Sequence, residues 1–264
     1  MTAAASLGGT PGITVGTISI SLWELAALVA AALFVGFAKT AIGGFGSISV
    51  AIFAAVLPAR ESTGALLPLL LVGDVMAVAL YRAHADWRIL LRLFPSVGVG
   101  VVAGTVFVAE VDDDAMRRTI GVMLIALVGV HLWTRRRPET RAVPDGLRRH
   151  GLAALYGTLA GFTTMVANAG GPVMSLYLLS AGLSMLGFLG TATMFFFLVN
   201  LSKVPFSLAL GLISRSSLLL DLLLVPPVLV GGWLGRRLIG RIDEKLFERL
   251  VLIATVLSAL NLLR

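Results

Sequence analysis

STGALLPLLLVGDVMAVALY, the stretch from Ser62 to Tyr81, carries a single charged residue, Asp74. A helix of about 20 apolar residues crosses the hydrocarbon core of a bilayer, which is roughly 30 Å thick. The stretch is apolar on every face, whereas the strands of a membrane β-barrel alternate apolar and polar residues. It therefore predicts a membrane-spanning α-helix.

The rest of the chain has the composition of a membrane protein. Of its 264 residues, 58% are hydrophobic and 13% charged, and the mean hydropathy is +0.96. A soluble domain of this length could not bury that much apolar surface. We expect an all-α membrane protein with five apolar segments in each half, at 20–38, 43–57, 62–81, 93–109, 117–133, 151–167, 172–181, 188–213, 217–235 and 246–263.

Charged residues lie mostly between these segments. The net charge is +7, but the arginines flank apolar runs, where they indicate membrane topology rather than nucleic-acid binding. The absence of cysteine excludes disulfides and thiolate metal sites. Residues 1–19 form an N-terminal tail without Lys or Arg, so the first apolar segment lacks the basic region of a secretory signal. We expect that segment to remain in the mature protein.

The linker at 134–150, TRRRPETRAVPDGLRRH, fixes the predicted orientation. It holds six arginines and two prolines, which is typical of a cytoplasmic connection. Alternating the segments from there places the other basic turns in the cytoplasm and the acidic patch at 110–114 outside. We expect a multi-pass protein of the bacterial inner (plasma) membrane with both termini in the periplasm. Segments 43–57 and 172–181 are short, and each either spans the membrane or re-enters it.

The two halves, 20–133 and 151–264, resemble each other. The matches are Leu25–Leu28 with Leu152–Leu155, Gly43-Gly44 with Gly170-Gly171, and Pro95, Gly100 and Gly104 with Pro226, Gly231 and Gly235. An odd number of segments in each half turns the second copy upside down, which predicts an inverted-topology repeat. The alternative is chance recurrence of Leu, Ala and Gly, which are common in membrane helices.

Two glycine-rich stretches interrupt the apolar segments at matching places, Ala38–Gly46 and Thr163–Pro172. Glycine permits the backbone conformations that end a helix, and proline suits the first turn of a new one. Both stretches therefore predict broken or re-entrant helices whose free N–H groups bind an anion. The candidate substrate-binding residues there are Lys39, Thr40, Gly43, Gly44, Asn168, Gly170 and Gly171, and Thr163 and Thr164 are possible further donors.

Each of these assignments has an alternative. Small residues such as these glycines also serve close helix packing in membranes. The side chain of Lys39 can instead extend to the cytoplasmic surface of the bilayer.

Charges inside apolar segments are the second indication of a site, because an ionisable side chain at the bilayer centre costs about 3 kcal/mol or more. Asp74 and Lys203 lie near the middle of 62–81 and 188–213. We expect them to meet near a twofold axis, where an anion or a proton that breaks their pairing would couple binding to gating. A purely structural ion pair is the alternative. Asn200, one helical turn from Lys203, is a further candidate for substrate binding.

The sequence lacks enzyme and metal signatures. It contains no HExxH, GxSxG or Walker motif, and none of the three histidines forms a spaced pair with another metal-binding residue. We therefore expect no catalytic residue, no metal and no cofactor.

Several stretches resemble the TauE/SafE sulfite exporter family, also called the toluene-sulfonate uptake permease (TSUP) family. They are GFAKTAIGGFGSISVAIFAAVLP from Gly36, STGALLPLLLVGD from Ser62, NAGGPVMSLYLLSAGL from Asn168, FLGTATMFFFLVNLSKVPF from Phe188 and PPVLVGGWLGRRLIGRIDEKLFERL from Pro226. The resemblance implies a permease for small anions with a sulfonate or carboxylate head. Ala41-Ile42 replace part of the richer glycine run of many members, which bears on the substrate more than on the fold.

The sequence thus predicts a secondary transporter, and most specifically an exporter, of sulfite, sulfoacetate or other organosulfonates by alternating access. Its expected partners are the small anion and the lipid bilayer, without nucleic acid, and a homodimer is one possible assembly. An anion channel is the nearest alternative. An intramembrane enzyme or a structural membrane subunit fits less well, because an enzyme needs convergent catalytic groups and a structural subunit leaves the matched glycine breaks unexplained.

Overall fold

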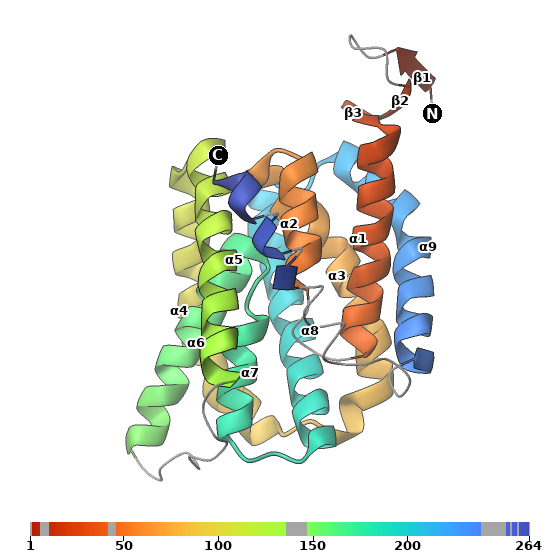
Figure 1. The fold of residues 1–264 in the computed structure, drawn as a ribbon. Coiled ribbons are helices and arrows are strands. Elements are labelled where there is room, and N and C mark those ends of the chain that lie inside the picture. The colour runs from red at the N-terminus through yellow and green to blue at the C-terminus, as the bar shows by residue number, and fades with distance from the viewer. Residues whose placement is uncertain are drawn as a thin grey trace.

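The computed structural model describes residues 2–5, 11–41, 46–135, 147–238 and, with gaps, 252–263. These residues form an α-helical bundle with a small N-terminal sheet (Figure 1). The helices are α1 (Leu22–Thr40), α2 (Ser47–Val56), α3 (Ala59–Tyr81), the 3-10 turn η1 (Arg82–His84), α4 (Trp87–Glu110), α5 (Asp113–Arg135), α6 (Leu147–Ala167), α7 (Gly171–Ser180), α8 (Met185–Ala209) and α9 (Arg215–Leu238). The all-α membrane fold predicted from the sequence is confirmed.

The N-terminal tail folds into strands that the sequence interpretation missed. Strands β1 (Thr2–Ala5), β2 (Pro11–Val15) and β3 (Ile18–Ser21) form an antiparallel sheet in that order. Gly16, with a φ of 62°, makes the tight turn between β2 and β3. The backbone N–H of Thr17 donates to the hydroxyl oxygen of Ser216 at the start of α9 (3.0 Å). The hydroxyl groups of the two residues also hydrogen-bond each other (2.9 Å). The sheet is thereby attached to the helical bundle.

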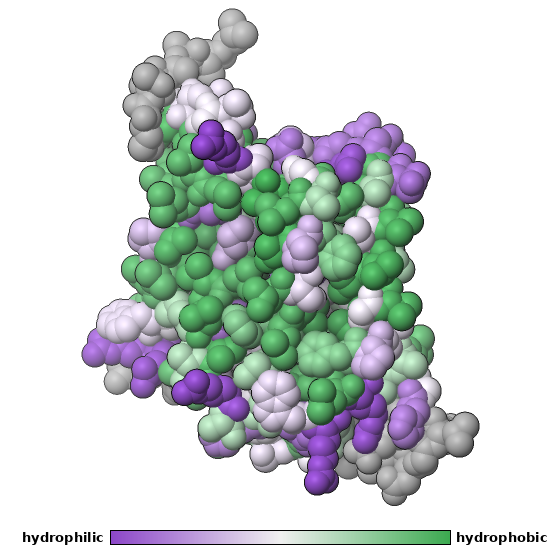
Figure 2. All heavy atoms as spheres, turned by 180° about the vertical axis from the view of Figure 1, so that it is seen from behind, coloured by the Kyte–Doolittle hydropathy of each residue, from purple (hydrophilic) through white to green (hydrophobic). Residues whose placement is uncertain are grey.

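The described part of the structure contains both long helices and two short ones. Five described helices are long and apolar enough to cross a membrane, namely α1, α3, α4, α8 and α9. The surface in Figure 2 is apolar around the middle of the molecule and polar toward both ends. By contrast, α2 and α7 have ten residues each, which rise only about 15 Å in a helix. That is half the thickness of the hydrocarbon core, so neither can span it alone.

Glycines allow two pairs of helices to pack with their backbones in contact. A Cβ atom at Gly36 of α1 would lie 1.9 Å from the carbonyl oxygen of Val228 in α9, and one at Gly231 of α9 would lie 1.9 Å from that of Leu33. These distances are far below van der Waals contact, so only glycine fits. The α1–α9 crossing therefore brings the two backbones into direct contact.

The α4–α6 pair repeats the same crossing. A Cβ at Gly161 of α6 would lie 2.3 Å from the carbonyl oxygen of Val97, and one at Gly100 of α4 would lie 2.1 Å from that of Thr158. The contact of Gly36 with Val228 thus corresponds to that of Gly161 with Val97. These contacts place Gly100 and Gly231 at equivalent positions, as the match predicted from the sequence does.

The contacts give a different register for the first helices of the two halves. Gly36 corresponds to Gly161, which shifts the predicted match of Leu25–Leu28 with Leu152–Leu155 by two residues. The predicted match was wrong because runs of Leu and Ala align at several registers. The glycine contacts are the better guide to the register, because a glycine in backbone contact cannot be shifted along the helix.

The third helices of the two halves, α3 and α8, also match. Gly64 near the start of α3 packs against Leu212 just beyond α8, and Gly190 near the start of α8 packs against Tyr81 at the end of α3. With Gly64 and Gly190 in register, the counterpart of Asp74 is Asn200. This pair lies at the centre of the site described below.

The helix directions follow from two kinds of contact. The hydroxyl of Tyr81, at the end of α3, donates to the carbonyl oxygen of Thr40 at the end of α1 (2.9 Å), so both helices end on the same side. We call this side, marked by residues 82–86, the α3–α4 end, and the side marked by 111–112 the α4–α5 end. α4 begins at the α3–α4 end and packs parallel to α6, so α6 runs opposite to α1.

Candidate functional site

A cavity of about 80 Å³ lies where both broken helices meet the long helices α3 and α8. This volume holds a few water-sized groups and suits a small ion better than a large organic ligand. Its lining comes from both halves of the chain, and its residues are Val35, Ala38, Lys39, Gly46, Ser47, Leu70, Asp74, Ala77, Thr164, Asn168, Ala169, Gly171, Pro172, Leu189, Ala192, Thr193, Phe196 and Asn200.

Two helix N-termini border this cavity. Gly46 and Ser47 belong to the start of α2, and Gly171 and Pro172 to the start of α7. Neither helix has a side-chain hydrogen bond at its N-cap, which is Gly46 in α2 and Gly170 in α7. The first-turn N–H groups and the positive ends of the helix dipoles are arranged as in anion sites.

An ion pair forms one wall of the cavity. Lys39, in the last turn of α1, donates from Nζ to Oδ1 of Asp74 at 2.5 Å. The second carboxylate oxygen, Oδ2, accepts from Nδ2 of Asn200 at 2.7 Å. The Asp74 side chain is 1% exposed and that of Lys39 is 17% exposed, so the ammonium is the more accessible partner. Lys39 Nζ also lies 5.0 Å from the ring centroid of Phe196.

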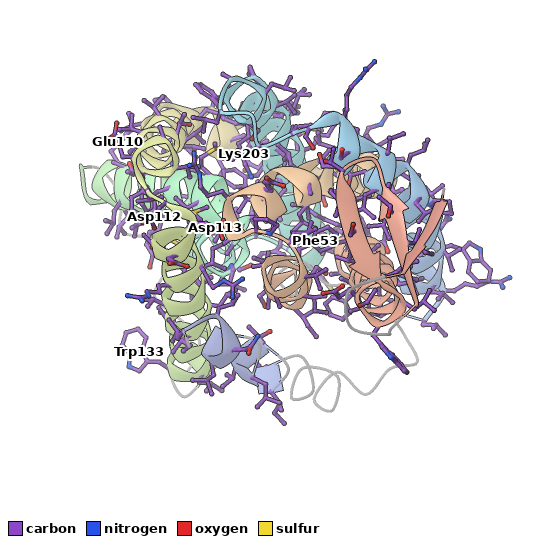
Figure 3. The ribbon with its side chains drawn as sticks, turned by 90° about the horizontal axis from the view of Figure 1, so that it is seen from above. Phe53, Glu110, Asp112, Asp113, Trp133 and Lys203 are labelled. Atoms are coloured by element: carbon purple, nitrogen blue, oxygen red, sulfur yellow. The ribbon has the colours of Figure 1, made fainter. Side chains whose placement is uncertain are left out.

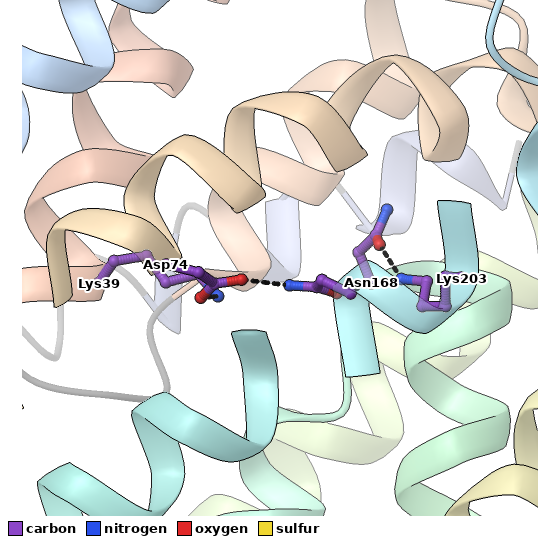
Figure 4. A network of polar contacts seen from close by, with 5 residues as sticks. Lys39, Asp74, Asn168 and Lys203 are labelled. Carbon is purple, nitrogen blue, oxygen red and sulfur yellow. Dashed lines mark hydrogen bonds and ion pairs between the residues drawn. The ribbon is translucent and has the colours of Figure 1, made fainter. Parts of the chain in front are cut away.

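A second lysine is bound on the other side of Asn200. Lys203 donates from Nζ to the carbonyl oxygen of Thr164 at 2.7 Å, to Oδ1 of Asn168 at 2.5 Å and to Oδ1 of Asn200 at 3.4 Å. The amide of Asn168 donates in turn to the carbonyl oxygen of Thr63 in α3 at 2.9 Å. Figure 4 shows the hydrogen bond between Asn168 and Lys203 from close by, and Figure 3 shows Lys203 among the helices, seen from above.

The predicted pairing of Asp74 with Lys203 was wrong. Asp74 pairs with Lys39, and Asn200 lies between Asp74 and Lys203. The reason is helical geometry, because Lys203 is three residues beyond Asn200 and hence about 4.5 Å further along α8. The cluster therefore contains two lysine side chains and one aspartate, a formal excess of one positive charge.

The cavity brings together some of the residues predicted for the site. Lys39, Asp74, Asn168, Gly171 and Asn200 line it, as does Thr164, named from the sequence as a further donor. Both halves of the chain thus contribute lining residues.

Other predicted residues lie elsewhere among the described part of the chain. Thr40 donates from its hydroxyl to the carbonyl oxygens of Gly36 (3.1 Å) and Gly232 (2.8 Å) and so joins α1 to α9. Gly170 packs against α6, and Lys203 is buried behind Asn168. Gly43 and Gly44 fall outside the described residues.

The sequence interpretation missed several lining residues. Ser47, Thr193 and Phe196 border the cavity, and they follow from no motif. A signal was present in the spacing along α8, because Phe196 and Thr193 lie four and seven residues before Asn200, which places them one and two turns earlier on the same helix face.

Asn168 offers a test of the network at the α6–α7 break. It is the one described non-glycine residue with a positive φ, 49°, and its side chain bonds both α3 and Lys203. Asn168→Ala should lower the free energy of unfolding by about 3 kcal/mol, through backbone strain and a lysine short of an acceptor. Asn168→Gly, which tolerates the φ, should lose about 1 kcal/mol less. Thermal unfolding of the purified variants measures both, and melting temperatures equal to that of the unsubstituted protein would contradict this reading.

Comparison with known proteins adds a family to this geometry. The chain matches the family model described as "Sulfite exporter TauE/SafE" over residues 28–262. No curated protein and no solved structure matches the chain. The matched range contains both helix breaks, both lysines and Asp74.

Proposed function

Because the chain belongs to the TauE/SafE sulfite exporter family, a family of membrane transporters and not of enzymes, we propose that it exports sulfite, sulfoacetate or other organosulfonates as a secondary transporter. One observation carries the proposal. The N-termini of α2 and α7 and the ammonium of Lys39 border one cavity. A sulfonate or sulfite group presents three oxygens, which can accept from backbone N–H groups and from the ammonium together.

The proposed binding step starts from the Lys39–Asp74 ion pair. An anion in the cavity competes with Asp74 for the ammonium, and the first-turn N–H groups of α2 and α7 complete its coordination. Asn200 keeps one oxygen of Asp74 hydrogen-bonded during this exchange, since it donates to Oδ2 while Lys39 donates to Oδ1. Asp74 and Lys203 are the proposed coupling residues, and loading the site changes the partners of Asp74 first.

We further propose that the halves form an inverted repeat that works by alternating access. The matching registers of the α1–α9 and α4–α6 crossings support this, as do the opposite directions of α1 and α6. The cavity is bordered by residues of α8 from Leu189 to Asn200, which lie toward the α3–α4 end. By the positive-inside rule that end is cytoplasmic, so an exporter would load there.

A channel is disfavoured by the packing at the α4–α5 end. A channel needs a continuous pore, yet Thr63, Leu66 and Leu67 of α3 are 5%, 1% and 0% exposed there. Lys203 of α8 is 2% exposed at the same end. Alternating access requires one closed end of this kind in each state.

Flux into proteoliposomes tests the proposed function. We expect saturable uptake of radiolabelled sulfite or sulfoacetate, with chloride uptake weak in the same vesicles. Vesicles that contain the Lys39→Gln/Asp74→Asn double variant serve as the matched control, because the substitutions remove both partners of the ion pair and leave neither as an unpaired buried charge. Folded, monodisperse protein that moves none of these anions would remove the proposal, and flux without saturation would favour a channel.

A further inference from the structure

We infer that Lys203 is a second anion-contacting residue, which takes the place of Lys39 when the cavity opens at the α4–α5 end. The inference rests on the proposed function, because it assigns Lys203 to the second state of an alternating-access cycle. It starts from the relation between Asp74 and Asn200. These residues are counterparts in the two halves and hydrogen-bond each other at 2.7 Å, as residues beside a twofold axis do.

The two lysines are arranged symmetrically about this pair. Lys39 donates to Asp74 at 2.5 Å, and Lys203 donates to Asn200 at 3.4 Å. Each ammonium thus lies beside one member of the central pair (Figure 4).

The surroundings of the two ammonium groups also match. Lys39 lies in the last turn of α1, and Lys203 bonds the carbonyl oxygen of Thr164 in the last turn of α6. In the register of the glycine contacts, Thr164 is the counterpart of Lys39. The second half thus has threonine where the first has lysine, and α8 supplies the missing ammonium.

The two lysines differ in access. The cavity reaches Lys39 along α8, past Leu189, Ala192 and Thr193. The counterparts of these three residues in α3 are Thr63, Leu66 and Leu67, which are buried, as Lys203 is. Exchanging the conformations of the two halves would therefore open a cavity along α3 and expose Lys203 in it.

Asn168 holds the closed end together. Its side chain accepts from Lys203 and donates to the carbonyl oxygen of Thr63, so it links α8 to α3 across the α6–α7 break. Opening at this end must break the bond to Thr63. An anion oxygen can then replace Oδ1 of Asn168 as the acceptor for Lys203, so the ammonium stays hydrogen-bonded.

Single cysteines test the second cavity cleanly, because the native chain has none. The variants are Thr193→Cys, in the present cavity, and Leu67→Cys, at its counterpart, each treated with a membrane-impermeant maleimide in right-side-out and inverted vesicles. Ala83→Cys and Asp112→Cys, at exposed positions near the α3–α4 and α4–α5 ends, identify the two faces. Sulfoacetate is the added anion, since sulfite itself reacts with maleimides.

We expect Thr193→Cys to react from the face of Ala83→Cys, and Leu67→Cys from the face of Asp112→Cys. Leu67→Cys should react about ten to a thousand times more slowly without anion, in proportion to a minor state. Adding Asn168→Ala should raise the labelling rate in the Leu67→Cys background and lower it in the Thr193→Cys background. If Leu67→Cys misfolds, two further single variants repeat the test at a second site. They are Thr63→Cys and Leu189→Cys, at its counterpart.

Directional kinetics test the role of Lys203 itself. Lys203→Gln should raise the KM at least about tenfold for anion offered at the α4–α5 end, and Lys39→Gln for anion offered at the α3–α4 end. A merely structural lysine would change both directions alike.

The outcomes separate the two proposals. Transport without labelling of Leu67→Cys or Thr63→Cys, or labelling of them from the face of Thr193→Cys, would overturn the inference and leave the proposed function standing. Reciprocal labelling in a protein that moves no anion would support the second cavity and remove the proposed function.

Discussion

Lys39→Gln should reduce sulfite or sulfoacetate uptake about a hundredfold at low anion concentration. Among the described residues, Lys39 is the only lysine or arginine that lines the cavity, and the substitution would leave Asp74 without its ion-pair partner. Truncating one partner of a buried charge pair costs about 2 to 5 kcal/mol, and 1.4 kcal/mol is tenfold. Initial uptake rates in proteoliposomes measure the loss.

Three variants separate binding from folding in this experiment. Lys39→Arg keeps the charge and should retain much of the uptake. Asp74→Asn leaves the ammonium without its carboxylate, so we expect tighter anion binding and slower turnover. The double variant Lys39→Gln/Asp74→Asn should recover thermal stability relative to Lys39→Gln but no uptake. A normal KM and rate for Lys39→Gln would show that the anion does not contact this ammonium.

Gly100→Ala should destabilise the protein by about 3 kcal/mol, near the upper end of the usual range for overpacking. The added Cβ would lie 2.1 Å from the backbone oxygen of Thr158, and backbone cannot move aside as a flexible side chain can. Its matched control lies two residues away in the same helix. A Cβ at Gly98 meets no atom within 4 Å, so Gly98→Ala should keep or slightly raise stability.

Thermal unfolding of the two alanine variants, followed by size-exclusion chromatography after heating, decides the matter. Gly231→Ala, at the counterpart position in α9, should behave as Gly100→Ala does. Equal melting temperatures for the Gly98 and Gly100 variants would mean that α4 and α6 do not pack in the register described.

The membrane fold was predictable because composition and run length dominate it. Apolar segments such as 62–81 match α3, Ala59–Tyr81, within a few residues. The short segments became the half-length helices α2 and α7, as a break next to glycine suggests. The small sheet was missed although β-branched residues flank Gly16-Thr17 on both sides, in Ile13–Val15 and Ile18–Ile20, which is a hairpin signal.

The partners within the site were less predictable. That Lys39, Asp74 and Asn200 carry the polar contacts could be predicted, because charged and amide side chains in apolar segments are expensive. The sequence could not predict which lysine binds Asp74. Asn200 and Lys203 are only three residues apart on α8, yet this spacing moves a side chain by a full contact distance. The alignment of α3 with α8 that pairs Asp74 with Asn200 follows from Gly64 and Gly190. Their part in packing becomes clear only when their neighbours in the structure are known.

The position of the anion is the most direct test of the account. Selenite is the selenium analogue of sulfite, and a chain without cysteine has no thiol with which it could react. Crystals grown with selenite should show one anomalous peak between the first turns of α2 and α7, within hydrogen-bonding reach of Lys39 Nζ, and excess sulfite should remove it. A sulfite-displaceable peak elsewhere, or an empty cavity in protein that binds labelled sulfite in the same buffer, would contradict the account.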